Sequence, residues 1–586
     1  MIESCEHFSS LLTDELYNVV SKNPQTFKSK KITFPTLGSL IVQLPEIADP
    51  LQNSQKKLVE DNEEKYVSPA TIPEPIEDID WEKLDVKVPP KNIKEACKKH
   101  VNSLLKSLTP LQTDIFSIIN KYHDFYYSER NFNNSKEIQF IYSLHAINHI
   151  VKVRSDIIKH TIAIKDKKGS SDKFRDQGLI RPKVLILLPF RSSALKVVEM
   201  ISSILLGDEK ANIVNKKRFF DEFTGDTLIL PKKNPKPADY EELFNGNIDD
   251  TFKIGLAVTK KSLKLYADFY SSDIIIASPL GLRMLVGAEG DKDRDYDFLA
   301  SIELLILDQT EIFLMQNWDH LLHIFNHFHL QPVESHGTDF SRVRTWALNG
   351  WAKYYRQTMI FSSMHLPEIA GLVSKHCFNY AGRLTSVNVI ASGSICQVIV
   401  DYPQVFHKIE GKTAMDVVDA RFEFFTKKIL INYQDQLMKN TVIYVPSYFD
   451  FVRIRNYFKK EDINFVQISE YSKDKKIARA RDLFYHSENH FLLYSERFHF
   501  FRRIRLRGIR HIIFYQPPTF ANFYSELINF MQDANQNPES GDKGNMTISV
   551  LYSKYDAPQL ASIVGSTRAS RMIVSDKSVH MFVSGS

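Results

Sequence analysis

Residues 304–314 read LLILDQTEIFL, a wholly apolar run that ends at Asp308 and is followed by Gln309. A short run of this kind is typical of a strand covered on both faces of a parallel sheet. Nine more short, mainly apolar runs occur along the chain, separated by loops and helical segments such as 108–119 and 136–158. The ten runs are 184–190, 253–258, 273–279, 304–308 and 358–364, and then 441–447, 464–469, 491–496, 511–516 and 547–553. Two sets of five predict an α/β protein with two tandem doubly wound parallel-sheet domains.

The domain boundaries follow from changes in composition. Residues 45–85 hold twelve Asp or Glu against four Lys, with five prolines, so little apolar surface can be buried there. We expect a flexible acidic linker, acting either as a solvated tether or as a site for a basic partner. The predicted division is an N-terminal region 1–90 containing this linker, a first domain 91–385, an interdomain linker 386–420 and a second domain 421–586. Ordered structure is expected to begin near residue 90.

Composition excludes several classes of protein. Hydrophobic residues make up 43% and charged residues 25%, and 75 basic against 70 acidic residues leave a net charge of only +5, so nucleic-acid binding would need local patches. The four cysteines form no Cys-x-x-Cys pair, which argues against zinc and disulfide frameworks. His320, His323 and His327 could share a helix face but lack further ligands, so no metal is expected. Without a basic and apolar leader or a run of roughly 20 apolar residues, we expect an intracellular soluble chain with no membrane contact.

Several strand ends carry elements that resemble those of DEAD-box helicases, and they occur in the same order. The resemblance implies RecA-like domains. The matching positions are Pro189 and Arg191 after the first run, Ser278, Pro279 and Arg283, Asp308, Gln309 and Glu311, Ser362, and Arg507 with Gly508. Each match alone is poor, and the ordered series is moderately specific.

The parts that carry chemistry in such motors are missing. Gln309 stands where a glutamate would activate water, and an amide cannot take a proton at neutral pH. No Gly-x-x-x-x-Gly-Lys-Ser/Thr loop precedes residue 184, although phosphate binding needs close backbone approach. Gly411, Lys412 and Thr413 come too late in the chain, and Phe406 replaces the first glycine. We therefore expect no catalysis, no cofactor and no small-molecule substrate; the alternative is an RNA-dependent ATPase that recruits Asp308, Glu311 and Lys412 to a divergent phosphate site.

Three longer strings make the resemblance more specific. They are RDQGLIRPKVLILLPFRSSAL (175–195), ESHGTDFSRVRTWALNGWAKYYRQTMIFS (334–362) and SERFHFFRRIRLRGIRHIIFYQPPTFANFYSE (495–526). They resemble the digestive organ expansion factor family, also called small nucleolar RNA-associated protein 25, over roughly residues 90–586. The resemblance implies a nucleolar, DEAD-box-like pseudohelicase of the small-subunit processome. It would be needed for processing pre-18S ribosomal RNA and would contact pre-ribosomal RNA, small nucleolar RNP and processome proteins. Family members have a longer acidic N-terminal arm than this chain.

Two basic stretches are candidate RNA contacts. The first consists of Arg497, Arg502, Arg503, Arg505, Arg507 and Arg510 interleaved with aromatic residues. In an extended segment Arg503, Arg505 and Arg507 would project to one side, and guanidinium groups suit phosphates. The alternative is that these arginines bind acidic protein segments, including the chain's own linker. A further alternative is that the protein is a pure protein-interaction module with no RNA contact. The second stretch contains Arg342 and Arg344 among Trp and Tyr, in a pattern that more often indicates a packed helix.

Overall fold

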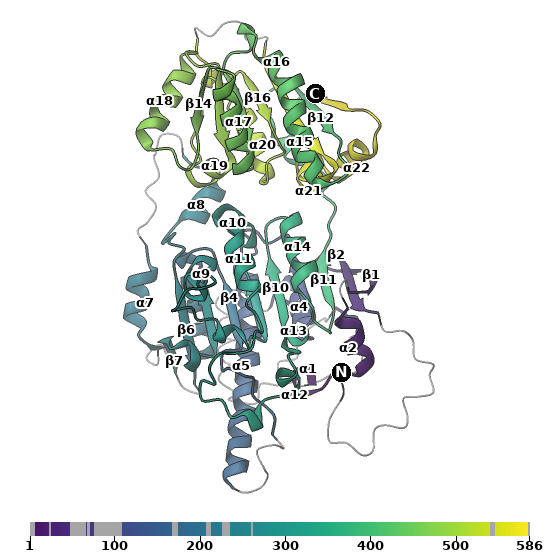
Figure 1. Ribbon diagram of the computed structural model, residues 1–586, viewed down its shortest axis with the longest axis vertical. Coiled ribbons are helices and arrows are strands. Elements are labelled where there is room, and N and C mark those ends of the chain that lie inside the picture. The colour runs from purple at the N-terminus through teal and green to yellow at the C-terminus, as the bar shows by residue number, and fades with distance from the viewer. Residues whose placement is uncertain are drawn as a thin grey trace. The chain divides into compact units, whose positions relative to one another are not determined.

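The computed structural model describes residues 6–22, 25–46, 66, 71–75, 108–166, 174–206, 213–225, 235–259, 262–538 and 545–583. These residues divide into two compact units, one within Met1–Leu230 and Pro237–Asn388, the other within Pro231–Lys236 and Val389–Ser586 (Figure 1). Most of the acidic stretch 45–85 lies outside the described residues. No helix in the described ranges is long and apolar enough to cross a membrane.

The described part of the first unit forms an 11-stranded sheet with the order β1-β2-β11-β3-β10-β9-β4-β8-β6-β7-β5. The strands are β1 (Phe27–Phe34), β2 (Gly38–Pro45), β3 (Asp124–Tyr127), β4 (Val184–Leu187), β5 (Ile213–Val214), β6 (Lys253–Val258), β7 (Leu263–Ala267), β8 (Ile274–Ala277), β9 (Leu304–Leu307), β10 (Gln357–Phe361) and β11 (Arg383–Ser386). The central strands from β11 to β8 are parallel. All five predicted runs of this unit are strands, but β6 pairs antiparallel with β7 and β8, which corrects the expectation of a parallel partner.

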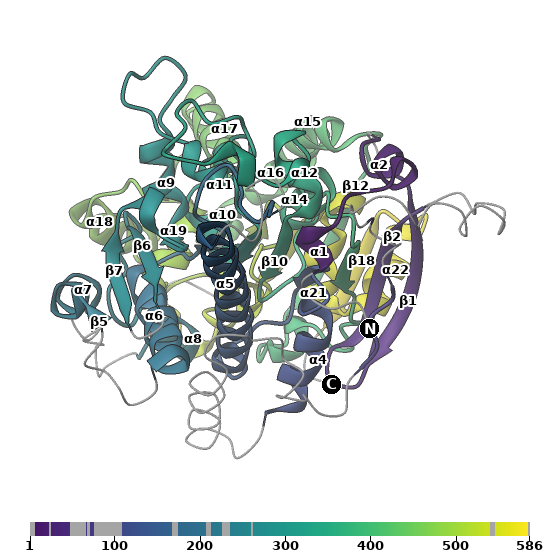
Figure 2. The same cartoon turned by 90° about the horizontal axis from the view of Figure 1, so that it is seen from below.

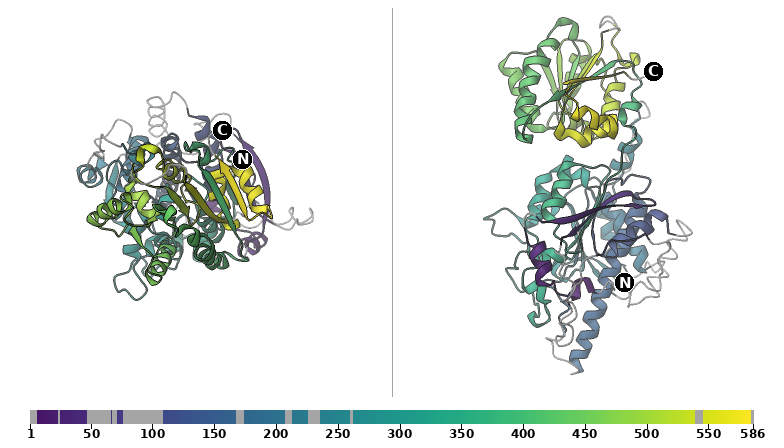
Figure 3. Two further views of the ribbon diagram at one scale, coloured as in Figure 1. Left: turned by 90° about the horizontal axis from the view of Figure 1, so that it is seen from above. Right: turned by 90° about the vertical axis from the view of Figure 1, so that its right-hand side faces the viewer.

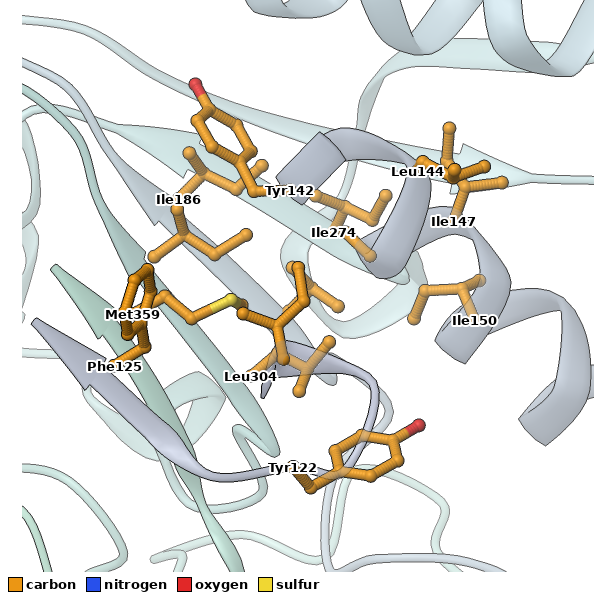
Figure 4. Packing of buried hydrophobic residues seen from close by; sticks show 14 of the residues in the cluster. Tyr122, Phe125, Tyr142, Leu144, Ile147, Ile150, Ile186, Ile274, Leu304 and Met359 are labelled. Carbon is orange, nitrogen blue, oxygen red and sulfur yellow. The ribbon is translucent and has the colours of Figure 1, made fainter. Parts of the chain in front are cut away.

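Helices cover both faces of this sheet, because every residue of β4, β8 and β9 is apolar and successive residues of a strand face opposite sides. Val184 and Ile186 pack into one cluster with α5, whereas Leu185 and Leu187 pack into another with α9, α11 and α14. Figures 1 and 2 show these helices on opposite sides of the sheet. Figure 4 shows Ile147 and Ile150 of α5 together with sheet residues of the same buried cluster, such as Ile186 and Leu304. The helices are α1 (Glu6–Ser9), α2 (Asp14–Val20), α4 (Pro110–Ile119), α5 (Ser135–Lys165), α6 (Arg191–Leu206), α7 (Lys216–Phe223), α8 (Ala238–Phe244), α9 (Pro279–Val286), α10 (Thr310–Gln316), α11 (Trp318–Phe325), α12 (Thr345–Leu348), α13 (Ala352–Tyr355) and α14 (Pro367–His376).

The N-terminal residues join the first unit, so the expectation that structure begins near residue 90 is wrong. The hairpin β1–β2 extends the sheet because β2 pairs antiparallel with β11 (Figure 2). Leu40 and Val42 of β2 are buried, whereas the exposed Lys28, Lys30 and Lys31 lie on the outer strand β1. Charged side chains on an edge strand discourage pairing with other chains.

The described part of the second unit forms a 7-stranded sheet with the order β14-β15-β13-β16-β17-β12-β18, parallel except for β18. Its strands are β12 (Pro403–Ile409), β13 (Thr441–Val445), β14 (Phe465–Ile468), β15 (Phe491–Ser495), β16 (His511–Phe514), β17 (Thr547–Ser553) and β18 (Val579–Val583). Its helices are α15 (Ala414–Phe424), α16 (Leu430–Tyr433), α17 (Tyr448–Lys460), α18 (Asp474–Tyr485), α19 (Glu496–Arg502), α20 (Ala521–Asn529), α21 (Ala557–Val564) and α22 (Ser566–Val574), and they lie on both faces (Figure 3). The predicted fold class, two tandem doubly wound α/β domains, is confirmed.

Candidate functional site

The carboxyl edge of the first sheet brings together the helicase-like positions of this unit. β4, β8, β9 and β10 run parallel, so the residues that follow them meet at one edge. Hydrogen bonds link the segments: Ser193 Oγ donates to Gln309 Oε1 at 2.6 Å, and Gln316 Nε2 donates to the Pro189 carbonyl at 2.9 Å. The sequence positions that were recognised one by one therefore form a single spatial cluster.

Asp308 is fully buried at the centre of this edge, and its carboxylate is occupied by side chains of the same unit. Arg130 Nε donates to Oδ1 at 2.8 Å, and the Gln309 backbone N–H donates to the same oxygen at 2.9 Å. Tyr142 Oη and Gln139 Nε2, both on α5, donate to Oδ2 at 3.2 Å and 3.4 Å. These donors fill the positions at which a carboxylate would bind a metal ion or its water.

The charges of the cluster stabilise one another. Burial alone would lower the pKa of Arg130, but the Asp308 and Glu311 carboxylates outweigh burial and raise it. Burial raises the pKa of Tyr142 well above its ordinary value, and the Asp308 charge adds to that effect. Burial also raises the pKa of Glu311, whose Oε2 accepts the Ser363 N–H at 3.2 Å. Arg130 is thus held as a cation that neutralises Asp308 inside the protein.

The segment 128–134 carries Arg130 next to Asp308 and has the strand-to-helix connection that a phosphate loop has. It joins the carboxyl end of β3 to α5, and phosphate loops likewise connect a strand to the start of a helix. The segment reads SERNFNN and contains no glycine. Its amides are already used: Arg130 N–H donates to the Ser362 carbonyl, Asn131 N–H to Asn134 Oδ1, and the Asn133 and Asn134 N–H groups to Asn131 Oδ1. Amides bound in this way are not directed at a phosphate.

The other predicted positions of this unit have structural partners. Ser278 caps α9 by accepting the Gly281 N–H at 2.9 Å, and Pro279 is the first residue of that helix. Arg191 begins α6 and pairs with Asp249 at 3.2 Å. Arg283 is half-buried on α9, where its charge adds to burial in lowering the pKa of His320. Ser362 Oγ donates to the Met364 carbonyl at 2.7 Å.

Four of the arginines predicted to contact RNA are buried. Arg342 pairs with Asp176 at 2.6 Å, and Arg344 pairs with Glu303 at 2.7 Å. Arg503 pairs with Glu526 at 2.7 Å and lies over the ring of Phe523, and Arg510 is only 6% exposed. Guanidinium groups enclosed in this way cannot reach phosphates, so these four arginines are not available for contact with RNA.

Residues 503–507 do not form the extended segment that the sequence predicted. Arg503 ends α19 in the left-handed conformation with φ 39°, and the residues after it form no strand. Arg503 is therefore turned inward, whereas Arg505 and Arg507 are exposed on either side of the buried Leu506. Gly508, with φ 78°, donates its N–H to the Asn535 carbonyl at 2.8 Å.

The exposed arginines lie beside a basic helix that the sequence reasoning did not single out. α18 exposes Lys475, Lys476, Arg479 and Arg481. Arg481 Nη2 donates to the Arg505 carbonyl at 3.3 Å, and Arg502 forms an ion pair with Asp474. We call the set the basic surface; its members are Lys475, Lys476, Arg479, Arg481, Arg502, Arg505 and Arg507. Arg497 lies nearby on α19, with its side chain 38% exposed and 3.9 Å from Glu470.

Arg130 and α18 were missed for different reasons. β3 reads DFYY, which lacks an aliphatic run, so neither the strand nor the segment after it was expected. The asparagine-rich turn before a strong helix was the available signal for that segment. For α18, the sequence DKKIARARDLFY has helical spacing, but only the fold brings it next to residues 502–507.

Comparisons with known proteins agree on one family. Residues 122–384 match the family model described as UTP25, NTP hydrolase-like domain, and residues 394–582 match Utp25, C-terminal domain. The chain is similar to the U3 small nucleolar RNA-associated protein 25 homologs of Xenopus tropicalis, at 50% identity over 82% of this chain and 63% of that protein, and of Homo sapiens, at 45% over 99% and 74%. The U3 small nucleolar RNA-associated protein 25 of Schizosaccharomyces japonicus is 41% identical over 81% of this chain and 73% of that protein.

The chain thus spans only part of these relatives, from 63% to 74% of their lengths. Among solved structures, the yeast DEAD-box splicing factor Prp28 aligns over 82% of both chains at 12% identity, with a TM-score of 0.29, too low for a conclusion. The two family models and the 45% identity to the human protein across 99% of the sequence show that this chain belongs to the UTP25 family.

Proposed function

We propose that this protein is a nucleolar ribosome-biogenesis factor, a non-catalytic scaffold of the small-subunit processome that is needed for pre-18S ribosomal RNA processing. Its relatives are named for association with the U3 small nucleolar RNA, which supports a role in the same particle. In this role it would hold pre-ribosomal RNA, small nucleolar RNP and processome proteins in position within the nucleus.

The observation that carries the non-catalytic part is the enclosure of Asp308. Hydrolysis of a nucleotide in a helicase-like motor needs this carboxylate for the metal and a neighbouring glutamate for water. Here Arg130 neutralises the carboxylate, Gln309 replaces the glutamate, and segment 128–134 uses its amides internally. The rival hypothesis of an active ATPase would require Arg130 to leave Asp308 and Glu311 to act from a buried position.

The first experiment measures ATP binding and hydrolysis by the purified full chain, with and without structured RNA. We expect neither binding nor turnover in the wild type or in Asp308→Ala. Turnover that RNA stimulates and that Asp308→Ala abolishes would overturn the non-catalytic proposal. Asp297→Ala is the matched control, because Asp297 is also buried but accepts hydrogen bonds from the loop residues Val333 and Glu334.

We further propose that the basic surface supplies the RNA contact. Its seven cations are exposed, and α18 itself carries four cations against two acids, Asp474 and Asp482. Arg502→Ala/Arg505→Ala/Arg507→Ala should reduce crosslinking to RNA and incorporation into pre-ribosomal particles. Lys28→Ala/Lys30→Ala/Lys31→Ala removes the same charge from exposed positions on β1 and should leave both unchanged. Equal losses, or none, in the two triple variants would contradict a role for the basic surface.

A further inference from the structure

Three aromatic side chains lie exposed at the carboxyl edge of the second sheet. Phe449 is 86% exposed, Tyr471 67% and Tyr448 40%. The rings of Tyr448 and Tyr471 approach edge to face, with centroids 5.3 Å apart, and the Tyr448 and Phe449 centroids are 6.5 Å apart. We call these three residues the aromatic patch. Large rings with such exposure, gathered in one place, commonly mark a binding surface.

The strand order places part of this patch at a position that suits ligand binding. The chain leaves β13 toward β14 on one side of the sheet, whereas it leaves β16 toward β17 on the other side. Because such crossovers are right-handed, the two connections lie on opposite faces and leave a crevice beyond the carboxyl ends of β13 and β16. Tyr448 and Phe449 begin α17 directly after β13. Tyr471 follows β14 at the same edge.

The aromatic patch adjoins the basic surface. Tyr471 is followed by the exposed Lys473 and by Asp474, which pairs with Arg502 of the basic surface. On the other side Glu470 accepts a hydrogen bond from Ser495 Oγ at 2.9 Å, which fixes the segment carrying Tyr471 against the end of β15. Exposed rings therefore lie next to exposed cations on elements that are held together by side-chain bonds.

We propose that the aromatic patch is a stacking platform for unpaired bases, so that this surface binds single-stranded RNA in preference to duplex. Cations that follow the phosphates and rings that stack on bases are the two components of single-strand binding. A duplex hides its base faces, so it could use only the basic surface. The neighbouring cations favour RNA over an apolar protein segment, which would gain nothing from them. The inference rests on the RNA contact proposed above and names the form of RNA.

The test compares the affinity of the full chain for a single-stranded 12-nucleotide uridine RNA and for a 12-base-pair RNA duplex, at several salt concentrations. Phe449→Ala and Tyr471→Ala should each weaken single-strand binding about fivefold or more. Neither should change duplex binding or the dependence of affinity on salt. Arg502→Ala/Arg505→Ala/Arg507→Ala should weaken binding to both RNAs and reduce the salt slope for the single strand by up to about 2.

The controls separate the two proposals. Phe340→Ala removes an aromatic ring that is 54% exposed in the first unit and should bind both RNAs like the wild type. If the aromatic variants bind the single strand as well as the wild type while the arginine variant does not, the stacking inference fails and the RNA contact stands. If the wild type binds neither RNA, the RNA contact itself fails. Aromatic variants that keep RNA affinity but lose a protein from purified particles would make the patch a protein surface instead.

Discussion

At the scale of single residues, Arg130 places a positive charge beside Asp308, where an active helicase would have a metal ion. A buried carboxylate is costly unless a positive charge and hydrogen bonds compensate it. Arg130, Tyr142, Gln139 and one backbone amide provide that compensation for Asp308 within the chain itself. The acid that most resembles a catalytic residue in the sequence is thereby part of the unit's structural core.

The pair can be tested by its effect on stability. Arg130→Ala should lower the free energy of unfolding of the first unit by about 3–5 kcal/mol, because it leaves Asp308 buried without a counter-charge. Removing both charges, in Arg130→Met/Asp308→Asn, should cost clearly less. Urea unfolding followed by circular dichroism measures both values.

Lys196→Ala is the control for that comparison. Lys196 pairs with Glu242 at 3.7 Å on the surface of the same unit, with its side chain 52% exposed. Its loss should change stability by no more than about 0.5 kcal/mol. A double variant as unstable as Arg130→Ala would show that the two charges do not act on each other.

A second residue, Glu496, should make the stability of the second unit depend on pH. Its side chain is fully buried, and burial raises its pKa from 4.5 to about 7, although the Thr519 N–H donates to its carboxylate at 3.1 Å. The folded state therefore binds the proton more tightly than the unfolded state. Stability should fall as pH rises from about 4.5 to about 7, where the folded state must hold a buried charge.

Glu496→Gln should remove that contribution, because the amide oxygen can still accept the Thr519 N–H and carries no charge. The measurement is the unfolding midpoint of wild type and variant at pH 5 and pH 8. The variant should gain stability relative to wild type at pH 8. Asp482→Asn, at a side chain 74% exposed, serves as the control, and parallel pH dependences for wild type and Glu496→Gln would refute the assignment.

At the scale of elements, the N-terminal helix α1 is anchored by distant residues, some of them more than 300 positions away in the sequence. The His7 ring stacks between Tyr122 and Tyr380, with centroids 5.0 Å and 4.5 Å away, and burial lowers its pKa to about 3. Trp346 Nε1 donates to the Phe8 carbonyl at 2.9 Å. The stretch around Trp346 was expected to be one packed helix; it is two short helices, α12 and α13, separated by Gly350 with φ 72°. Trp346 and Tyr355 are buried, so their role in the core is as expected.

This anchoring predicts a large effect of a single truncation. Phe8 is 4% exposed and packs against Tyr122, His149 and Trp346. Phe8→Ala should destabilise the first unit by about 3–5 kcal/mol, since the cavity lies within a well-packed cluster. Val333→Ala, at a side chain 76% exposed, should change the unfolding midpoint little. An unchanged midpoint for Phe8→Ala would mean that α1 does not contribute to the unit's stability in solution.

Local helix structure also explains two motifs that suggested phosphate or RNA binding in the sequence. Gly411, Lys412 and Thr413 form the start of α15: Thr413 accepts the Asp416 N–H at 3.1 Å and donates its own N–H to Asp416. This capping box stabilises a helix end and uses the residues that a phosphate loop would need free. In the arginine stretch, the left-handed conformation at Arg503 breaks the alternation on which the extended interpretation depended.

At the scale of the whole molecule, the sequence predicted the apolar strands better than the strands that contain aromatic or polar residues. All ten apolar runs are strands, because residues such as Val184 and Leu304 can be buried on either face of a sheet. The strands that were missed, such as β3 (DFYY) and β11 (RLTS), contain aromatic or polar residues and are buried only because neighbours cover them. The hairpin β1–β2 was missed because its outer strand is polar, and only its pairing with β11 shows that it belongs to the sheet.

The sequence by itself determined the α/β class, the ten apolar strands of the two sheets, the order of the helicase-like elements and the absence of a glycine-rich phosphate loop. These properties depend on apolar runs and on residue identities, which are local. Only the tertiary structure decided that Arg130 neutralises Asp308, that Arg342, Arg344, Arg503 and Arg510 are buried, and that α18 lies beside Arg505. Whether a charged side chain faces solvent or a buried partner depends on which distant segments the fold brings together, and no local pattern encodes that.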